Sequence, residues 1–128
     1  MALAQLLDAD ATTRAGLPTV SAVELMHDWD INVSRASEIL GLSRRQFGRL
    51  RKDQGSTLGP VESDRMMRVQ KVLEQALAVF DSRAVAIEWL GSPIRALNGR
   101  SPLSLLDTDA GIESVRTVLG RIEHGVFS

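Results

Sequence analysis

Apolar residues recur at helical spacing along most of the chain, and no segment shows the strict alternation typical of a β-strand. The clearest case is the segment 63–80, whose apolar positions follow a helical period: Met66, Met67, Val69, Val72, Leu73, Ala76, Leu77 and Phe80. Shorter patterns predict helices over about 21–29 and 83–90, a short one at 103–106, and a last one from residue 109. We therefore predict an all-α fold.

Helix-capping residues mark where several of these helices are expected to begin. Ser21 and Glu24 form an S-x-x-E pattern, in which each side chain accepts a hydrogen bond from a backbone N–H of the first turn. Candidate caps precede three further helices, at Ser63, Ser101 and Thr108. Asn98-Gly99 is a turn signal between two of the predicted helices.

Turn-forming residues cluster in one place, the run from Asp53 to Pro60, which reads DQGSTLGP. Glycine, proline, serine and aspartate favour turns over regular structure. We take this run as the boundary between an N-terminal domain, residues 1–57, and a C-terminal domain, residues 58–128. Residues 1–18 are expected to form either a weak helix or a partly disordered arm.

The composition narrows the class of protein. The 128 residues are 44% hydrophobic and 24% charged, which is typical of a folded globular chain. Cysteine is absent, so disulfides and thiolate metal sites are excluded, and we expect neither a metal nor a cofactor. No apolar run approaches the roughly 20 residues that span a bilayer, and the N-terminus lacks the basic start of a signal peptide. We therefore expect a cytoplasmic protein that does not contact a membrane.

Charge is distributed unevenly, although the formal net charge of the chain is only −1. Residues 1–33 contain one arginine and five acidic residues, a net charge of −4, whereas residues 34–54 contain six basic and two acidic residues, a net charge of +4. A basic block inside a nearly neutral chain indicates contact with a polyanion. The alternative is a solvated helix face, and charge alone does not separate the two.

The basic block contains the pattern of a helix-turn-helix, ASEILGLSRRQFGRL, over residues 36–50. This motif needs a small residue where its two helices cross, and Ser37 takes that place. Four positions later, Gly41 suits the left-handed backbone of the tight turn. The apolar anchors that would hold the helices together are Ile39, Leu40, Leu42, Phe47 and Leu50. The alternative is an ordinary helical hairpin with a basic surface.

The second helix of this motif is the candidate DNA-reading element. Ser43 is placed to cap it or to contact a phosphate. Because Phe47 and Leu50 face inward, polar side chains remain on the outer side: Arg44, Arg45, Gln46, Arg49 and Lys52. Arginine pairs with the acceptors of guanine, and glutamine pairs with the edge of adenine. We therefore predict that Ser43 and these five residues bind DNA.

The C-terminal half contains a longer and more specific pattern. Residues 86–108 read AIEWLGSPIRALNGRSPLSLLDT, and the chain continues as GIESV at 111–115 and LGRIEHGVF at 119–127. This half resembles the toxin-binding domain of the Xre/MbcA/ParS antitoxins, the partners of RES-domain toxins. The helix-turn-helix and the run ESDR at 62–65 fit the same group, so the resemblance extends over roughly residues 33–128.

The resemblance implies a function for the whole chain. It implies a Cro-like helix-turn-helix unit followed by a small helical toxin-binding domain, as in a type II antitoxin. The partner would be a RES-domain toxin that consumes NAD or transfers ADP-ribose, and the antitoxin would block access to the toxin's active site. The resemblance also implies repression of the antitoxin's own operon at operator DNA, and a homodimer within a larger toxin–antitoxin complex.

The toxin-binding residues that the resemblance implies lie in the last forty positions. They are Trp89, Leu90, Pro93, Asn98, Gly99, Pro102, Arg121, Gly125, Val126, Phe127 and Ser128. Several also have a structural interpretation, because Trp89-Leu90 before a proline suits a core and Pro102 suits a helix start. Gly99 and Gly125 suit a turn and a helix end. The apolar tail after Gly125 has nothing beyond it to bury it, so we expect it to contact the toxin.

Two other functions compete with this interpretation. A stand-alone helix-turn-helix transcription regulator, with a C-terminal dimerisation or ligand-sensing domain, explains the N-terminal half alone. An enzyme is disfavoured, because His27 and His124 are the only histidines and no nucleophile motif, phosphate loop or metal-spaced cluster accompanies them. We therefore predict a protein that is not an enzyme.

Overall fold

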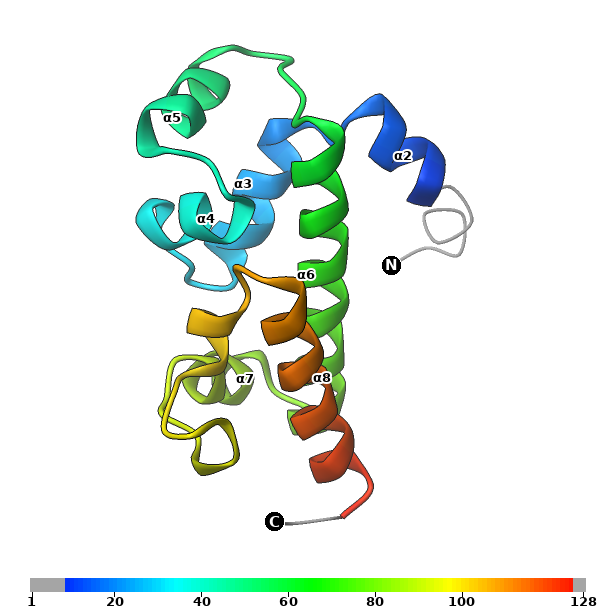
Figure 1. The fold of residues 1–128 in the computed structure, drawn as a ribbon, viewed down its shortest axis with the longest axis vertical. Coiled ribbons are helices and arrows are strands. Elements are labelled where there is room, and N and C mark those ends of the chain that lie inside the picture. Colours follow the sequence, from blue (N-terminus) through cyan, green and yellow to red (C-terminus); the bar gives the residue numbers. More distant parts are fainter. Residues whose placement is uncertain (1–8, 126–128) are drawn as a thin grey trace. The chain divides into compact units, whose positions relative to one another are not determined.

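The computed structural model describes residues 9–125 of the chain (Figure 1). In chain order the elements are α2 (Ala9–Ala15), α3 (Thr19–Asp28), α4 (Val33–Leu40), α5 (Arg44–Lys52), α6 (Pro60–Phe80), α7 (Arg83–Leu90), the 3₁₀ helices η1 (Arg95–Leu97) and η2 (Pro102–Leu105), and α8 (Asp109–Glu123). The described residues contain no strand, and their only β-type pairings are two isolated bridges, Pro18 with Thr57 and Ile94 with Arg100. The predicted all-α class is confirmed.

The chain divides into two compact units, unit 1 up to Met67 and unit 2 from Arg68 onward. We expected a boundary after residue 57, in the turn-rich run, whereas the division lies inside α6. The first turns of α6 stay with unit 1 because they are bonded to the chain ahead of α3. The Leu17 backbone N–H donates to Ser63 Oγ (2.8 Å), and the Leu58 N–H donates to the Leu17 carbonyl (2.8 Å).

The start of α6 differs from the prediction. The helix begins at Pro60 rather than after a cap at Ser63, and Ser63 is fully buried inside its first turns. Proline explains the earlier start, because its fixed φ suits the first helical position and it has no N–H to satisfy there. Besides accepting from Leu17, Ser63 Oγ donates to the Leu58 carbonyl (3.3 Å). Ser63 therefore anchors two segments instead of capping a helix.

The start of α3 differs as well. It begins at Thr19 after Pro18, with no side-chain cap hydrogen bond, so the expected capping box of Ser21 and Glu24 is wrong. Both residues lie inside the helix and are exposed. The backbone N–H of Thr19 donates to the Ser56 carbonyl (3.0 Å), which holds the start of α3 against a loop far away in the sequence. A hydrogen bond between segments so far apart cannot be predicted from the local sequence pattern.

The core of unit 1 is formed by α3, α4, α5 and the start of α6. Its buried apolar residues are Ala22, Met26, Trp29, Ile31, Ala36, Ile39, Leu40, Phe47, Leu58, Met66 and Met67. Helix α5 packs against both α3 and α4 (Figure 1). Phe47 is 1% exposed and is the largest fully buried side chain of the chain's described part, so it fixes the rotation of α5 and turns the opposite face toward solvent.

The core of unit 2 is formed by the remainder of α6 with α7, η1, η2 and α8. Its buried apolar residues are Val69, Val72, Leu73, Ala76, Ala86, Leu90, Leu97, Leu106, Ile112, Val115, Val118 and Leu119. Helix α8 approaches η2 so closely that a Cβ atom at Gly111 would collide with the Leu105 carbonyl. A glycine is therefore required there by packing, although its backbone conformation is ordinary.

Most predicted boundaries in unit 2 are confirmed. Ser101 caps η2 and Thr108 caps α8, since their hydroxyl oxygens accept from the Ser104 N–H (3.3 Å) and the Gly111 N–H (2.9 Å). Asn98 and Gly99 have φ values of 58° and 79°, the positive values of a tight turn. Gly125, with φ 72°, follows the end of α8. Across residues 9–125, every helix is too short or too polar to cross a bilayer.

Candidate functional site

Helices α4 and α5 form the helix-turn-helix that the sequence predicts. Gly41 ends α4 with φ 72°, a left-handed conformation that glycine adopts without strain. Ser37 is buried, and its Oγ donates to the Ser34 carbonyl (2.8 Å), so the polar residue at the helix crossing is satisfied. The anchors divide into a buried group, Ile39, Leu40 and Phe47, and a half-buried pair, Leu42 and Leu50.

The N-terminus of α5 is closed by a reciprocal capping box. Ser43 Oγ accepts from the Gln46 backbone N–H (3.0 Å), and the Gln46 side-chain oxygen Oε1 accepts from the Ser43 backbone N–H (2.8 Å). The predicted Ser43 cap is therefore confirmed. The second bond was not predicted, and it changes the chemistry of Gln46. An adenine edge needs both the oxygen and the nitrogen of an amide, and here the oxygen is already engaged.

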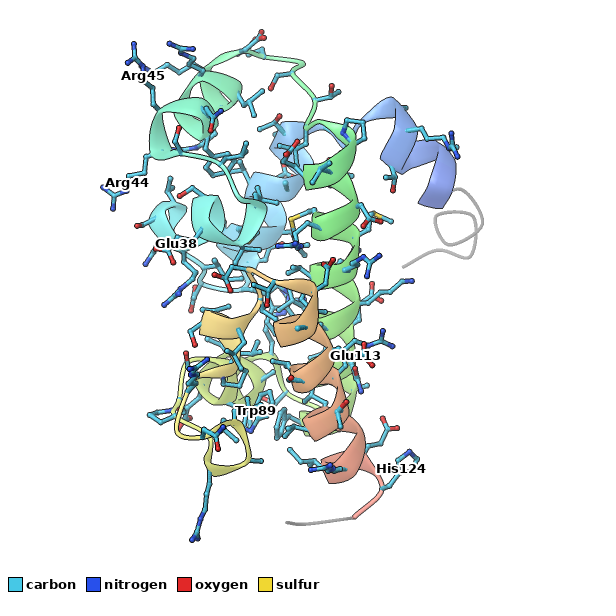
Figure 2. All side chains as sticks on the ribbon, in the orientation of Figure 1. Glu38, Arg44, Arg45, Trp89, Glu113 and His124 are labelled. Carbon is cyan, nitrogen blue, oxygen red and sulfur yellow. The ribbon has the colours of Figure 1, made fainter. Side chains whose placement is uncertain are left out.

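The basic side chains of α5 fall into two groups. Arg44 donates to Ser34 Oγ (2.8 Å) and ties α5 to α4, while the Arg51 guanidinium lies 5.9 Å from the centre of the Phe47 ring. Arg45, Arg49 and Lys52 are exposed and make no hydrogen bond or ion pair with any residue in the described part of the chain. Figure 2 shows Arg44 and Arg45 extending outward from α5. The unengaged group is free to bind an external anion.

The start of α4 adds residues that the sequence interpretation missed. Asn32 caps α4 through Oδ1, which accepts from the Arg35 backbone N–H (2.8 Å), and the Arg35 side chain pairs with Glu38 (3.2 Å). Because Arg44 reaches Ser34, the N-terminus of α4 and the basic face of α5 form one surface. Asparagine ahead of a helical pattern is a cap signal, so the role of Asn32 could have been predicted from the sequence.

A groove of about 620 Å³ lies on another side of unit 1, between α3 and the end of α5. Gly48 lines it with Val20 and Val23, and a Cβ atom at Gly48 would meet no atom within 4 Å. Val20 is 60% exposed there. Nothing within unit 1 therefore explains a glycine in the middle of α5, where it weakens a helix relative to alanine.

The toxin-binding residues predicted in unit 2 are not equivalent in the structure. Leu90 and Pro102 are buried in the core, so their side chains support the fold from within. Trp89 is half-buried and packs against Phe80, with 5.3 Å between ring centroids (Figure 2). Exposed positions are Pro93, Asn98, Gly99, Arg121 and Gly125. The remaining predicted residues, Val126, Phe127 and Ser128, lie outside the described residues.

Two of the exposed predicted residues meet in one groove. Its volume is about 760 Å³, and it is lined by Ala96, Leu97, Asn98, Arg100, Leu105, Thr108, Ala110, Gly111, Glu113, Ser114, Thr117, Val118 and Arg121. Asn98 comes from the turn after η1, and Arg121 comes from α8. The guanidinium groups of Arg100 and Arg121 make no hydrogen bond or ion pair to any residue that the structure describes. The groove thus combines an apolar floor with two unengaged cations and one acid, Glu113.

The two histidines do not form part of a titratable cluster. His27 lies near the end of α3, and His124 follows the last turn of α8, 3.9 Å from the Glu123 carboxylate and exposed (Figure 2). Within residues 9–125, no group of three or more histidine, aspartate and glutamate side chains is arranged to hold a metal ion.

Comparison with known proteins places both halves of the chain in one group. Residues 8–71 match the family described as the antitoxin Xre-like helix-turn-helix domain, and residues 75–125 match the antitoxin Xre/MbcA/ParS C-terminal toxin-binding domain. A protein named Antitoxin Xre from Yersinia enterocolitica is 36% identical over 112 residues, which are 86% of this chain and 75% of that protein. Another protein of that name, from Photorhabdus laumondii, is 32% identical over 121 residues, 93% of this chain and 80% of its relative.

These matches cover the helix-turn-helix of unit 1 and the grooved surface of unit 2. Both matched families are described as domains of antitoxins, not as domains of enzymes. Together with the geometry of α4 and α5, they show that this chain belongs to the Xre/MbcA/ParS family of antitoxins, with an Xre-like helix-turn-helix domain followed by the family's C-terminal toxin-binding domain.

Proposed function

We propose that the chain is a type II antitoxin that neutralises a RES-domain toxin by covering its active site and represses its own operon by binding operator DNA. The observation that carries the proposal is the match of residues 75–125 to a toxin-binding domain, because an independent regulator has no need for one. The helix-turn-helix supplies the DNA-binding half. The working form would be a homodimer, because two-fold-related motifs fit the half-sites of a palindromic operator.

The groove of unit 2 is our candidate for the toxin contact. It is the place where predicted residues from two distant segments, Asn98 and Arg121, line one surface. Its apolar floor offers area to bury, and Arg100 and Arg121 offer charge-assisted hydrogen bonds to carboxylates of a partner. Trp89, half-buried beside Phe80, is the aromatic residue that we expect to contribute at the edge of the interface.

The inhibition we propose is steric. Docking of unit 2 would place the end of the chain, including Val126, Phe127 and Ser128, over the dinucleotide pocket in which the toxin consumes NAD or transfers ADP-ribose. Such a mechanism needs complementary surfaces and no reacting group in this chain. The antitoxin would therefore act at a stoichiometric ratio to the toxin.

The DNA contact we propose involves the surface formed by α5 and the start of α4. Ser43, Arg44, Arg45, Arg49 and Lys52 from the predicted set remain candidates, and Gln46 contributes mainly by capping the helix. Asn32, Ser34 and Arg35 extend this surface toward the phosphate backbone. Because the contacts are cationic, binding should weaken steeply as salt rises.

Growth of cells that express the protein encoded by the adjacent open reading frame, which we expect to be a RES-type toxin, tests the proposal. We expect the toxin alone to stop growth, the full-length antitoxin to restore it, and a version truncated after Glu123 to fail. Purified, truncated protein with an unchanged circular dichroism spectrum would exclude misfolding as the cause. If the full chain binds its upstream DNA but does not restore growth, the stand-alone transcription regulator is the better description.

A further inference from the structure

Arg45 and Arg49 differ from the other arginines on the DNA-facing surface of unit 1. Both are exposed, both lie on the face of α5 opposite Phe47, and neither is bonded to another residue within the described chain. Arginine presents a rigid fork of N–H groups that matches the O6 and N7 acceptors of guanine in the major groove. These two residues are therefore available for bidentate base contacts.

The other candidate side chains for base reading on α5 mostly interact with the protein itself. The Ser43 backbone N–H holds the Gln46 side-chain oxygen in the capping box, so a bidentate pair with adenine would have to share that oxygen with the cap. Arg44 is bonded to Ser34, and Arg51 lies against the Phe47 ring. Lys52 is also unengaged, but it is the last residue of α5, and its ammonium is a point charge without the rigid fork of an arginine.

The spacing of the two free arginines sets the spacing of the bases they can reach. They are four residues apart on one helix, which corresponds to a rise of about 6 Å. Successive base pairs are separated by about 3.4 Å along the duplex. We infer that Arg45 and Arg49 each read one guanine, at positions about two base-pair steps apart in each operator half-site. This inference rests on the proposed DNA-binding function and specifies the sequence class that the site accepts.

Selection of bound duplexes from a randomised DNA library tests this inference. The full-length protein would be used both alone and in complex with its toxin. The wild-type chain should enrich sites with two guanines about two steps apart, on either strand. Arg45→Ala should lose the preference at one of these positions and Arg49→Ala at the other, each by about tenfold against the other bases, as expected for the loss of one bidentate contact.

Two further variants separate base reading from general affinity. Arg45→Gln should shift the preference at its position from guanine toward adenine, because an amide that is not engaged in capping matches the adenine edge. Gln46→Ala should keep both guanine preferences while lowering helix stability. Arg45 and Arg49 are exposed, so we expect their substitution to leave the fold intact, and a circular dichroism melt verifies this for each variant.

The possible failures are distinguishable. An enriched motif without the guanine pair, or a pair that survives in both alanine variants, would overturn this inference and leave operator binding intact. If Gln46→Ala loses the base preference while its helix content is unchanged, Gln46 reads the bases, and the assignment of this role to Arg45 and Arg49 is wrong. Absence of binding to any duplex, with and without the toxin, would refute the DNA-binding proposal and this inference together.

Discussion

The two units expose unengaged arginines in different ways. In unit 1, Arg45 and Arg49 project from one short helix whose rotation is set by the burial of Phe47. In unit 2, Arg100 and Arg121 come from a loop and from α8, and they line the same groove only because the chain between them folds back. The first arrangement is a property of helical periodicity, and the second is a property of packing.

This difference explains which of the two surfaces is readable from sequence. A recognition helix shows its exposed face through residues three and four positions apart, so charge and pattern coincide within one segment. A groove between a loop and a helix has no period. The residues of such a groove can be predicted only from resemblance to a family. That resemblance does not separate exposed residues from core residues such as Leu90 and Pro102.

The strongest test of the packing in unit 2 compares two glycines of α8. Gly111→Ala should lower the free energy of unfolding by about 1–3 kcal/mol, the usual cost of overpacking, because its Cβ would meet the Leu105 carbonyl. Gly120→Ala is the matched control, since nothing lies within 4 Å of its Cβ. It should instead raise the free energy of unfolding by about 0.5–1 kcal/mol. Urea denaturation measures both, and equal effects would contradict the close approach of η2 to α8.

A second test asks whether the two surfaces act separately. Arg100→Glu combined with Arg121→Glu should weaken toxin binding by about tenfold or more, because unpaired like charges would face each other across the interface. Operator binding by this variant should stay within about twofold, because neither residue belongs to the helix-turn-helix and charges exposed to the salt solution are screened. Arg45→Ala should instead weaken operator binding and leave toxin binding unchanged.

Calorimetry with the purified toxin and a DNA mobility shift on the same preparations measure the two activities. Arg116→Glu, at an exposed arginine on α8 outside the groove, provides a control for charge reversal. A variant that loses both activities while remaining folded would show that toxin and DNA share one coupled surface.

A third, smaller effect concerns the cap of the recognition helix. Ser43→Ala should destabilise unit 1 by about 1 kcal/mol, because it removes the acceptor for the Gln46 N–H. Ser21→Ala should be nearly neutral, since Ser21 lies inside α3 and does not cap it. Thermal unfolding measures the stability of both variants. A loss of stability in Ser21→Ala would support the S-x-x-E interpretation over the structure.

The smallest expected effect concerns Lys52. If it contacts a phosphate, Lys52→Gln should weaken binding to all sequences alike and reduce the slope of log affinity against log salt by about 1. The preferred base sequence should not change. Titration of a fluorescent duplex at several salt concentrations measures the slope, and an unchanged slope would remove Lys52 from the phosphate contacts.

Much of the fold was predictable because it is set by short-range rules. Gly41, Ser43, Ser101 and Thr108 occupy the turn and cap positions expected of them, since each acts on a backbone group within three or four residues. The predictions at Ser21 and Ser63 were wrong because longer-range bonds override the local preference there. Backbone pairing with the loop at 56–57 holds Pro18 and Thr19 in place. The Ser63 hydroxyl is already hydrogen-bonded to the Leu17 N–H and the Leu58 carbonyl.

The sequence by itself determined that the chain is helical, that a basic helix-turn-helix lies near its middle and that its C-terminal half belongs with the toxin-binding domains. The tertiary structure decided which arginines are free, that the Gln46 side chain closes the start of α5, and that Asn98 and Arg121 line one groove. The physical reason is the range of the interactions. Periodicity and capping act within a helical turn, whereas the partner of a side chain depends on which distant segment is folded against it.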